Sequence, residues 1–469
     1  MKVTIENVGK ISNAEISVDG LTVIAAPNNT GKSTIGKAVF VAFDAFTDFQ
    51  SNVRNDQAQL IERILRQEYP TAQECRLFKK DPSTSYFIRR IESVGMILGK
   101  HIVQVCDKRV VDEQELITLL QQCNIDLHDD QYTTGTYHYS ENNKEKFFEA
   151  LKATISNLTQ DSEESHKIRM EILSYLNVDI NILSTQFIDR YLKNFFKGQF
   201  TSEFINSPNH SSLVLQNHQG DIIRKLIFEN GKCTEVYPIE DEHHRVFILD
   251  DPRIPESFGH RSFGSGERYA KRLLDAVLNQ QDQVEDNPAS GLTETVSNSK
   301  AIRQITDMLN SSFNGHIEFD AKGEPILSTK APVRNPIKLT NASMGVKAYI
   351  ALRYLIENAI IHDGDILVLD EPEIHLHPEW QVAYAHALVL TAKLLGIHLI
   401  ITTHSPFFLK ALVAYSNTEG IADSTHYYTA KENSEGPVSF HEINGEGIAK
   451  LYARMAAPLM KIDSDVRHG

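Results

Sequence analysis

The order of apolar and polar residues predicts a sheet that is built from both ends of the chain. Residues 3–26 alternate apolar and polar positions and then become continuously apolar in "LTVIAA", as strands that lead into a buried sheet do. Near the other end, helical patterns at 344–361 and 379–395 alternate with the apolar runs "DILVLD" and "HLIITTHS". Strands that alternate with helices favour a parallel sheet with helices packed on it. The predicted fold class is α/β, with a mixed sheet and an inserted, mainly helical region.

The residues between these ends follow other patterns. A helix is expected from Lys32 to about Phe46, and the mostly helical text that follows indicates an inserted region. A polar stretch at 279–300 predicts a mobile loop, and "HIEFDAKGEPILST" predicts a hairpin that turns at Lys322 and Gly323. The predicted organisation is an N-terminal lobe at 1–48, a helical insertion at 49–210, a strand-rich segment with linker at 211–300, a C-terminal lobe at 301–415 and a C-terminal extension at 416–469.

Composition narrows the class of protein. The 469 residues are 41% hydrophobic and 23% charged, which is typical of a globular protein. The N-terminus lacks the apolar core of a signal peptide, no apolar run predicts a membrane span, and the four cysteines show no CxxC spacing. These features favour a reducing cytoplasm. The formal net charge of −15 argues against an extensive nucleic-acid-binding surface, because phosphate contacts need clustered Lys and Arg. A local basic groove in a dimer stays compatible with that charge.

The segment "APNNTGKST" at 26–34 follows an apolar strand and opens a helix, which is the context of a phosphate-binding loop. Gly31 lets the backbone curl so that successive N–H groups and the positive end of the helix face phosphate oxygens. Lys32 supplies a charge for the β- and γ-phosphates, and Ser33 offers its hydroxyl to Mg²⁺. Ala26 replaces the first glycine of the pattern, which we interpret as a variation within the motif. The predicted phosphate-binding residues are Asn28, Asn29, Thr30, Gly31, Lys32, Ser33 and Thr34.

The segment "ILVLDEPEIHLHP" places two carboxylates directly after an apolar strand. Beside a phosphate-binding loop, Asp370 is expected to contact Mg²⁺ directly or through water. Glu371 is expected to orient or deprotonate an attacking water. His375 and His377 stand at alternate positions, as zinc ligands can, but structural zinc needs four ligands and no third is placed nearby. We favour a role for these two histidines in a turn that contacts a second subunit.

Two further segments complete the predicted site. "LIITTHSPFF" is an apolar strand that ends in His404, whose imidazole is placed to contact the γ-phosphate and to sense its loss. "NASMGVKAYIAL" presents Ser343 and Gly345 at a helix start, where a hydroxyl and N–H groups bind an anion. The stretch "SFGSGERYAKRLL" at 262–274 is a rival for this role, but it lies farther from the Asp370 strand.

The four segments "IENVGKISNAEI", "APNNTGKST", "DEPEIHLHP" and "ITTHSPFFL" together resemble the ATP-binding-cassette-like ATPases of the RecF, SMC and OLD (overcoming lysogenisation defect) group. The resemblance covers about 1–48 and 330–415. It implies a P-loop NTPase head that dimerises head-to-head around two ATP molecules with Mg²⁺. The residues it assigns are Lys32, Ser33 and Thr34 for phosphate and Mg²⁺, Ser343 and Gly345 for the opposite subunit's site, Asp370 for Mg²⁺, Glu371 as catalytic base and His404 as switch histidine.

Two features depart from that family's pattern. The signature around Ser343 lacks the more usual Ser-Gly-Gly form, so its register stays open. A glutamine should follow the first helix, and Gln50 is the only near candidate.

The resemblance also narrows the role. OLD nucleases continue into a Toprim nuclease domain, for which the roughly 60 residues after "THSPFF" are too few, and the middle of the chain lacks the sustained heptads of SMC coiled coils. We therefore expect an ATPase subunit of a bacterial anti-phage system, such as a Septu or retron-associated module, that controls a separately encoded effector, often a nuclease. Two alternatives remain open. One is a DNA-repair or recombination ATPase that acts on DNA, and the other is a nucleotide-locked dimer that never hydrolyses ATP.

Overall fold

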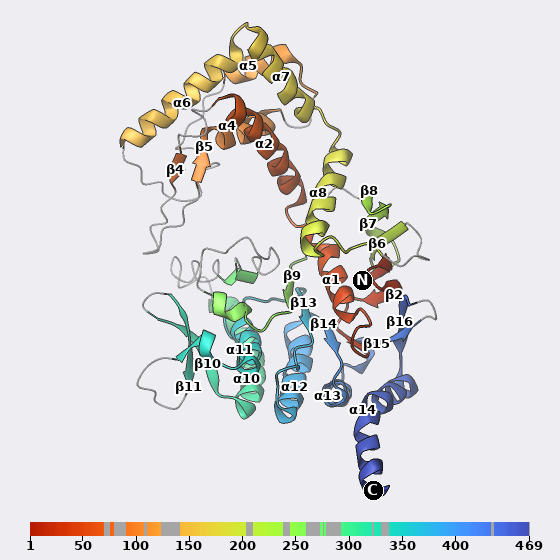
Figure 1. Ribbon diagram of the computed structural model, residues 1–469. Helices are drawn as coiled ribbons and strands as arrows, with labels where there is room; N and C mark the ends of the chain where they lie inside the picture. Colours follow the sequence, from red (N-terminus) through yellow and green to blue (C-terminus); the bar gives the residue numbers. More distant parts are fainter. Residues whose placement is uncertain are drawn as a thin grey trace. The chain divides into compact units, whose positions relative to one another are not determined.

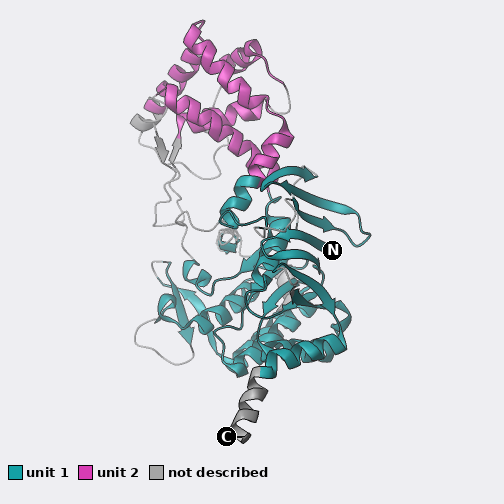
Figure 2. Cartoon of the chain, turned by 45° about the vertical axis from the view of Figure 1, so that its right-hand side comes forward, with its two compact units in different colours: residues 1–47, 189–238, 242–469 teal, residues 48–188, 239–241 magenta. Residues whose placement is uncertain are grey.

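The chain folds into two compact units (Figures 1 and 2). Unit 1 comprises Met1–Thr47, Asp189–Pro238 and Glu242–Gly469, and unit 2 comprises Asp48–Ile188 and Ile239–Asp241. A computed structural model describes residues 1–69, 76–78, 91–106, 110–122, 141–202, 210–237, 244–258, 273–274, 276–277, 292–320, 323–329, 337–432 and 436–468.

Unit 1 contains an 11-stranded sheet with helices on its faces (Figure 1). Its strands are β1 (Lys2–Val8), β2 (Ile11–Ser17), β3 (Leu21–Ala25), β6 (His210–Gln216), β7 (Ile222–Glu229), β8 (Lys232–Tyr237), β9 (Val246–Leu249), β13 (Ile366–Asp370), β14 (His398–Thr403), β15 (Thr425–Glu432) and β16 (Val438–Ile443). Its helices are α1 (Lys32–Asp44), α10 (Leu292–Ser312), α11 (Met344–Glu357), α12 (Pro378–Leu395), α13 (Pro406–Thr418) and α14 (Gly445–His468). A smaller sheet consists of β10 (Gly315–Phe319), β11 (Pro325–Thr329) and β12 (Ile337–Lys338), and the 3-10 turns are η1 (Ile254–Ser257), η2 (Leu339–Asn341) and η3 (Ala422–Ser424).

The strand order of the large sheet is β8-β7-β6-β1-β2-β16-β15-β3-β14-β13-β9. From β15 to β9 every neighbouring pair is parallel, whereas β1 pairs antiparallel with both β2 and β6, and β6-β7-β8 form an antiparallel meander. The predicted α/β class with a mixed sheet is therefore confirmed. The carboxyl ends of the five parallel strands meet at one edge, which is where α/β proteins place their ligands.

Both faces of the parallel strands are covered, which explains why β3 and β13 are mostly apolar and why β14 is buried from Leu399 to Thr403. Side chains alternate between the faces of a strand. Leu367 and Leu399 belong to one buried cluster with α11, α12 and α13. Val368 faces α1, and a Cβ atom on Gly36 of that helix would lie 3.1 Å from the Val368 Cγ1 atom. Gly36 therefore lets α1 lie close to the sheet.

Unit 2 has a hydrophobic core of its own, formed by helices. Its elements are α2 (Phe49–Glu68), β4 (Arg76–Phe78), β5 (Ile91–Ser93), α4 (Val94–Val105), α5 (Glu113–Gln121), α6 (Glu141–Thr159), α7 (Glu163–Leu176) and most of α8 (Ile180–Phe195). Ile61 of α2, Leu98 of α4, Leu116 of α5 and Ile172 of α7 are among its buried residues. Each helix thus contributes one apolar face, as amphipathic helices do.

Three segments differ from their predicted limits. The helix expected at 344–361 ends at Glu357, because Ala359 adopts a positive φ of 48° and the Ile360 N–H turns back to the Leu355 carbonyl. The polar stretch expected as a loop at 279–300 becomes helical at Leu292, and residues 278–291 lie outside the described part. The segment 416–469, expected as an extension, contributes β15 and β16 to the large sheet, with β15 beside β3. None of the described helices combines the length and apolar character needed to cross a bilayer.

The insertion of β15 next to β3 generates a stability prediction. Gly20 has a φ of +61°, and a Cβ atom there would lie 2.2 Å from the carbonyl oxygen of Ser424, the residue before β15. We expect Gly20→Ala to destabilise unit 1 by about 1 to 3 kcal/mol more than Gly220→Ala, because overpacking adds to the cost of the left-handed backbone. Gly220 is a matched control with a φ of +88° and no atom within 4 Å of the added Cβ. Urea unfolding measures the difference, and equal midpoints for the two variants would contradict the tight approach.

Candidate functional site

Four polar segments come together where parallel strands of unit 1 end. The loop at 26–31 follows β3. Asp370 is the last residue of β13 and Glu371 comes directly after it, and His404 follows β14. A fourth pair, Asp250 and Asp251, follows β9. Parallel pairing places these four strand ends at the same edge of the sheet.

The loop between β3 and α1 has the backbone of an anion-binding loop. Asn29 and Gly31 adopt positive φ values of 63° and 95°, and Gly31 is the N-cap of α1 without a side-chain cap. The first turn of α1 contains no acidic residue. Its N–H groups, which have no partners inside the helix, are therefore available to an anion. The loop is braced from within, because the Thr30 hydroxyl donates to the Pro27 carbonyl at 2.9 Å.

The residues of this loop differ in exposure. Ala26 is fully buried, and its N–H donates to the Thr403 carbonyl at 3.3 Å, so the residue that replaces the first glycine sits between two strand ends. Asn28 and Asn29 are exposed, whereas Ser33 and Thr34 are half-buried. The ammonium of Lys10, from the turn after β1, donates to the Asn29 side chain at 2.7 Å.

Lys32 is buried beneath the loop, with a side chain that is only 4% exposed. Its ammonium donates to the Pro27 carbonyl at 2.9 Å and lies 3.3 Å from the Glu371 Oε1 atom. A lysine this deeply buried needs such partners, because an unpaired charge is costly to remove from water. The structure thus brings together Lys32 and Glu371, which are far apart in the sequence.

Asp370 and Glu371 are held by the neighbouring strand. The Thr402 hydroxyl donates to the Asp370 carboxylate, and the Glu371 N–H donates to the Thr402 carbonyl at 3.2 Å and hydroxyl at 3.0 Å. Glu371 has a φ of 47°, a left-handed backbone that costs about 1 to 3 kcal/mol for a residue with a side chain. This sharp turn ends β13 immediately after Asp370.

His404 lies on the other side of Glu371. Its Nδ1 atom is 3.2 Å from the Glu371 Oε1 atom, the same oxygen that faces Lys32. The imidazole is about one third exposed. Lys32, Glu371 and His404 therefore form one cluster around a single carboxylate oxygen.

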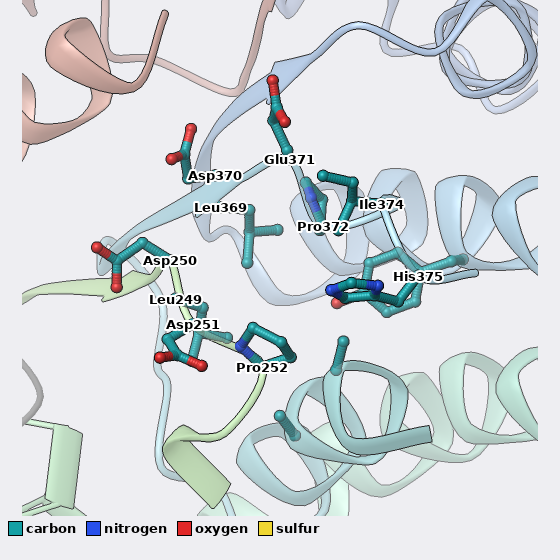
Figure 3. A pocket seen from close by; sticks show the side chains of 13 residues that line it. Leu249, Asp250, Asp251, Pro252, Leu369, Asp370, Glu371, Pro372, Ile374 and His375 are labelled. Carbon is teal, nitrogen blue, oxygen red and sulfur yellow. The ribbon is translucent and has the colours of Figure 1, made fainter. Parts of the chain in front are cut away.

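A cavity of about 260 Å³ opens beside these carboxylates (Figure 3). Asp250, Asp251 and Asp370 lie on one side of it, and Ile374 and His375 lie on the other. The pairing of Leu249 with Leu369 puts Asp250 level with Asp370.

Asp250 and Asp251 are site residues that the sequence analysis missed. The Lys37 ammonium of α1 lies 3.7 Å from Asp250, and hydrogen bonds from Arg253 lower the pKa of Asp251. The available signal was "VFILDD", which ends in carboxylates as "ILVLDE" does. Gln50, the glutamine candidate, lies in the first turn of α2.

Ser343 and Gly345 have structural roles within this chain. The Ser343 side chain caps α11 by accepting from the Val346 N–H at 3.3 Å, and Ser343 is exposed. A Cβ atom on Gly345 would lie 2.4 Å from the His375 carbonyl oxygen, so glycine lets α11 contact the turn after β13. No hydrogen bond or ion pair among the described residues joins Ser343 or Gly345 to Lys32, Asp370 or His404 of the same chain.

The remaining candidates have these positions. His377 caps α12 by accepting from the Glu379 N–H at 3.4 Å. Within the described part of the chain, no three His, Cys, Asp or Glu residues are arranged to hold a metal ion by themselves. The rival signature at 262–274 falls almost entirely on residues 259–272, which lie outside the described part.

Comparison with known proteins identifies the kind of domain. A family model described as "AAA ATPase domain" matches residues 1–409. Among solved structures, the chain is similar to an SMC head bound to the C-winged helix domain of ScpA, with 11% identity, 96% of this chain and 98% of that chain covered, and a TM-score of 0.43. It is also similar to the SMC head domain from Thermotoga maritima, with 11% identity, 95% and 98% coverage and a TM-score of 0.33. A third is the Smc head domain with an extended coiled coil bound to the C-terminal domain of ScpA from Pyrococcus furiosus, with 11% identity, 99% and 98% coverage and a TM-score of 0.33. Among curated proteins, none matches.

The buried ammonium of Lys32 generates a binding prediction. We expect Lys32→Ala to weaken the binding of a non-hydrolysable ATP analogue by about 10- to 100-fold, because a charge-assisted hydrogen bond is worth about 1.5 to 3 kcal/mol. The matched control is Lys225→Ala, which removes a lysine that is about one third exposed and pairs with Glu235 at 3.1 Å. Calorimetric titration measures both affinities. Equal affinities for Lys32→Ala and the control would contradict a nucleotide site at this loop.

Proposed function

The chain belongs to the AAA ATPase domain family, and we propose that it binds ATP with Mg²⁺ at the edge of the parallel sheet and hydrolyses it. The observation that supports this best is the convergence on Glu371, whose Oε1 atom lies 3.3 Å from the Lys32 ammonium and 3.2 Å from the His404 ring. A phosphate-binding lysine and a carboxylate base at adjacent strand ends suit phosphoryl transfer to water, and a histidine beside them is placed to contact the transferred group.

The residues present fit a nucleotide with its metal ion. The uncapped N–H groups of α1 and the Lys32 ammonium suit phosphate oxygens. The half-buried Ser33 hydroxyl and the Asp370 carboxylate, which Thr402 fixes, are oxygen donors of the type that Mg²⁺ prefers, with phosphate and water completing its shell. Bound Mg²⁺ would neutralise charge on the phosphates.

Each residue of the cluster then has a distinct role. Glu371 accepts a proton from the attacking water, and its left-handed turn directs its carboxylate away from Asp370. His404 contacts the γ-phosphate, and its ring, 3.2 Å from the Glu371 Oε1 atom, limits the space open to that carboxylate. Lys32 binds the β- and γ-phosphates, a role for which it must exchange its contact with Glu371 for one with phosphate.

We also propose that the site is completed by a second copy of the chain. Ser343 is exposed at the start of α11, where it and the N–H groups near Gly345 can reach a γ-phosphate bound to another subunit. Ile374, in the turn after Glu371, and Phe407, at the start of α13, are 54% and 46% exposed. Large apolar side chains exposed beside a site favour its coverage by a protein surface.

The biological role that we propose is control of a separately encoded effector, such as a nuclease, in anti-phage defence. The motifs "APNNTGKST", "DEPEIHLHP" and "ITTHSPFFL" support membership of the RecF, SMC and OLD group. The defence role itself is supported by the wider resemblance of the chain to the ATPase subunits of such systems. The alternative is an ATPase that acts directly on DNA. A net charge of −15 makes the alternative less favoured.

Replacement of the proposed base tests hydrolysis. We expect Glu371→Gln to lower kcat by about 100-fold or more, because it removes the proton acceptor, while ATP-dependent dimers persist. The control is Glu379→Gln, an exposed residue in the first turn of α12. Phosphate release and light scattering after gel filtration measure the two properties. Turnover equal to wild type would exclude Glu371 as the base, and ATP-dependent wild-type dimers without turnover would establish the locked dimer.

The effector proposal is tested by purifying the chain with its native neighbours. We expect a protein encoded beside it to co-purify in a fixed ratio, as determined by native mass spectrometry, and Lys32→Ala to change that ratio because ATP organises the dimer. The alternative function is tested by measuring ATP turnover with and without DNA. ATP turnover that DNA stimulates, with a steep decrease as salt rises, and no co-purified protein would establish the DNA-acting alternative.

A further inference from the structure

Glu373 is a buried carboxylic acid in the turn that carries the proposed base. It lies two residues after Glu371 and is only 1% exposed. Burial raises the pKa of its carboxyl above the ordinary value for glutamate. Among the described residues no cation forms an ion pair with it, and its Oε2 atom is buried without a hydrogen bond. These surroundings favour the neutral acid, because an ionised carboxylate is costly in such a place.

The other carboxyl oxygen binds the end of the histidine strand. Its Oε1 atom accepts hydrogen bonds from the Thr403 hydroxyl and, at 3.3 Å, from the His404 N–H. The Thr403 hydroxyl in turn accepts from the Ser405 N–H at 3.0 Å. One oxygen of Glu373 therefore fixes the backbone at the point where β14 ends and His404 begins.

A second set of contacts holds the Glu373 turn itself. Gln381 of α12 donates to the Glu373 carbonyl at 3.4 Å and to the Leu376 carbonyl at 3.1 Å, and it accepts from the Ser405 hydroxyl at 2.7 Å. The turn after β13, the end of β14 and the first turn of α12 are thus connected in a closed hydrogen-bond network. A closed network of buried polar groups restricts its members to one arrangement.

We propose that Glu373 is a positioning residue for ATP hydrolysis, which holds the His404 backbone so that the imidazole stays in register with Glu371. This rests on the function proposed above for Glu371 and His404. His404 reaches Glu371 through its side chain and Glu373 through its backbone. A shift at the end of β14 would therefore change the separation of the imidazole from the Glu371 carboxylate. Misplacement of a catalytic group by about 1 Å is enough to cost on the order of 100-fold in rate.

Packing alone does not account for a glutamate here. A buried carboxyl is among the least favourable side chains for filling an apolar site, and an aliphatic residue would avoid its desolvation. What the carboxyl adds is one oxygen that accepts from two donors on the same strand end. Glutamine keeps such an oxygen without the acid, whereas alanine removes it.

The test compares Glu373→Ala, Glu373→Gln and the exposed control Glu379→Ala. We expect Glu373→Ala to lower kcat by about tenfold or more, with affinity for a non-hydrolysable ATP analogue changed less than about twofold. Glu373→Gln should retain most of the rate. Thr403→Val, which deletes one donor, should lower kcat in the same direction, and Thr403→Ser should not. An unchanged kcat in folded Glu373→Ala, or an equal loss in the Gln and Ala variants, overturns the proposal.

Hydrogen exchange separates this proposal from the proposed function. Glu373→Ala removes the acceptor of the His404 N–H, so exchange in a peptide that spans 402–406 should accelerate in that variant and not in Glu379→Ala. This readout needs no turnover. Absence of turnover in the wild type would count against ATP hydrolysis by the chain, whereas unchanged exchange in Glu373→Ala would count against the positioning role alone.

Discussion

The ammonium of Lys32 meets the carboxylate of Glu371 because β3 and β13 both pair, in parallel, with β14. Every other feature of the site depends on this arrangement. Parallel strands bring their carboxyl ends to one edge, so the residues that follow each strand become neighbours whatever their separation in sequence. The register matters as much as the order, because a one-residue slip of β13 would turn Asp370 from the α1 face to the opposite face.

The site also shows how much local strain and burial the sheet supports. Glu371 has a left-handed backbone. Two buried ionisable residues lie beside it: Lys32, which contacts its carboxylate, and Glu373, two residues later in the chain. Each of these is unfavourable alone. The Glu371 turn and Glu373 persist because Thr402 and Thr403 of β14 form hydrogen bonds with Asp370, with the Glu371 N–H and with Glu373. Lys32 persists because its ammonium contacts the Pro27 carbonyl and Glu371. A single strand end thus organises the acidic turn, and its two threonines point in opposite directions to do so.

The sequence predicted the local features of the molecule well and the long-range ones less well. The strands that end at Ala25, Asp370 and Thr403 were predictable, because buried parallel strands are continuous apolar runs and the loops after them have distinctive residues. The pairing of β15 with β3 was not predictable, since the sequence of a strand does not specify which other strand it pairs with. Asp250 was missed although "VFILDD" ends in carboxylates, because that pattern does not state that β9 pairs with β13. Glu373 was read as part of a motif, but its burial depends on packing that the motif does not encode.

The neighbours of β3 have a consequence for biosynthesis. Leu21 of β3 pairs with Leu399 of β14 on one side and with Thr425 of β15 on the other, so both strands that pair with β3 are synthesised long after it. Until then the nascent chain carries an apolar strand with two unsatisfied edges, which is a hazard for aggregation. Nearly all of unit 2 is one continuous segment, and it has its own core. It can therefore fold before the last strands of the large sheet are synthesised. A chaperone that shields β3 during translation would therefore matter more to the yield of this protein than to its final stability.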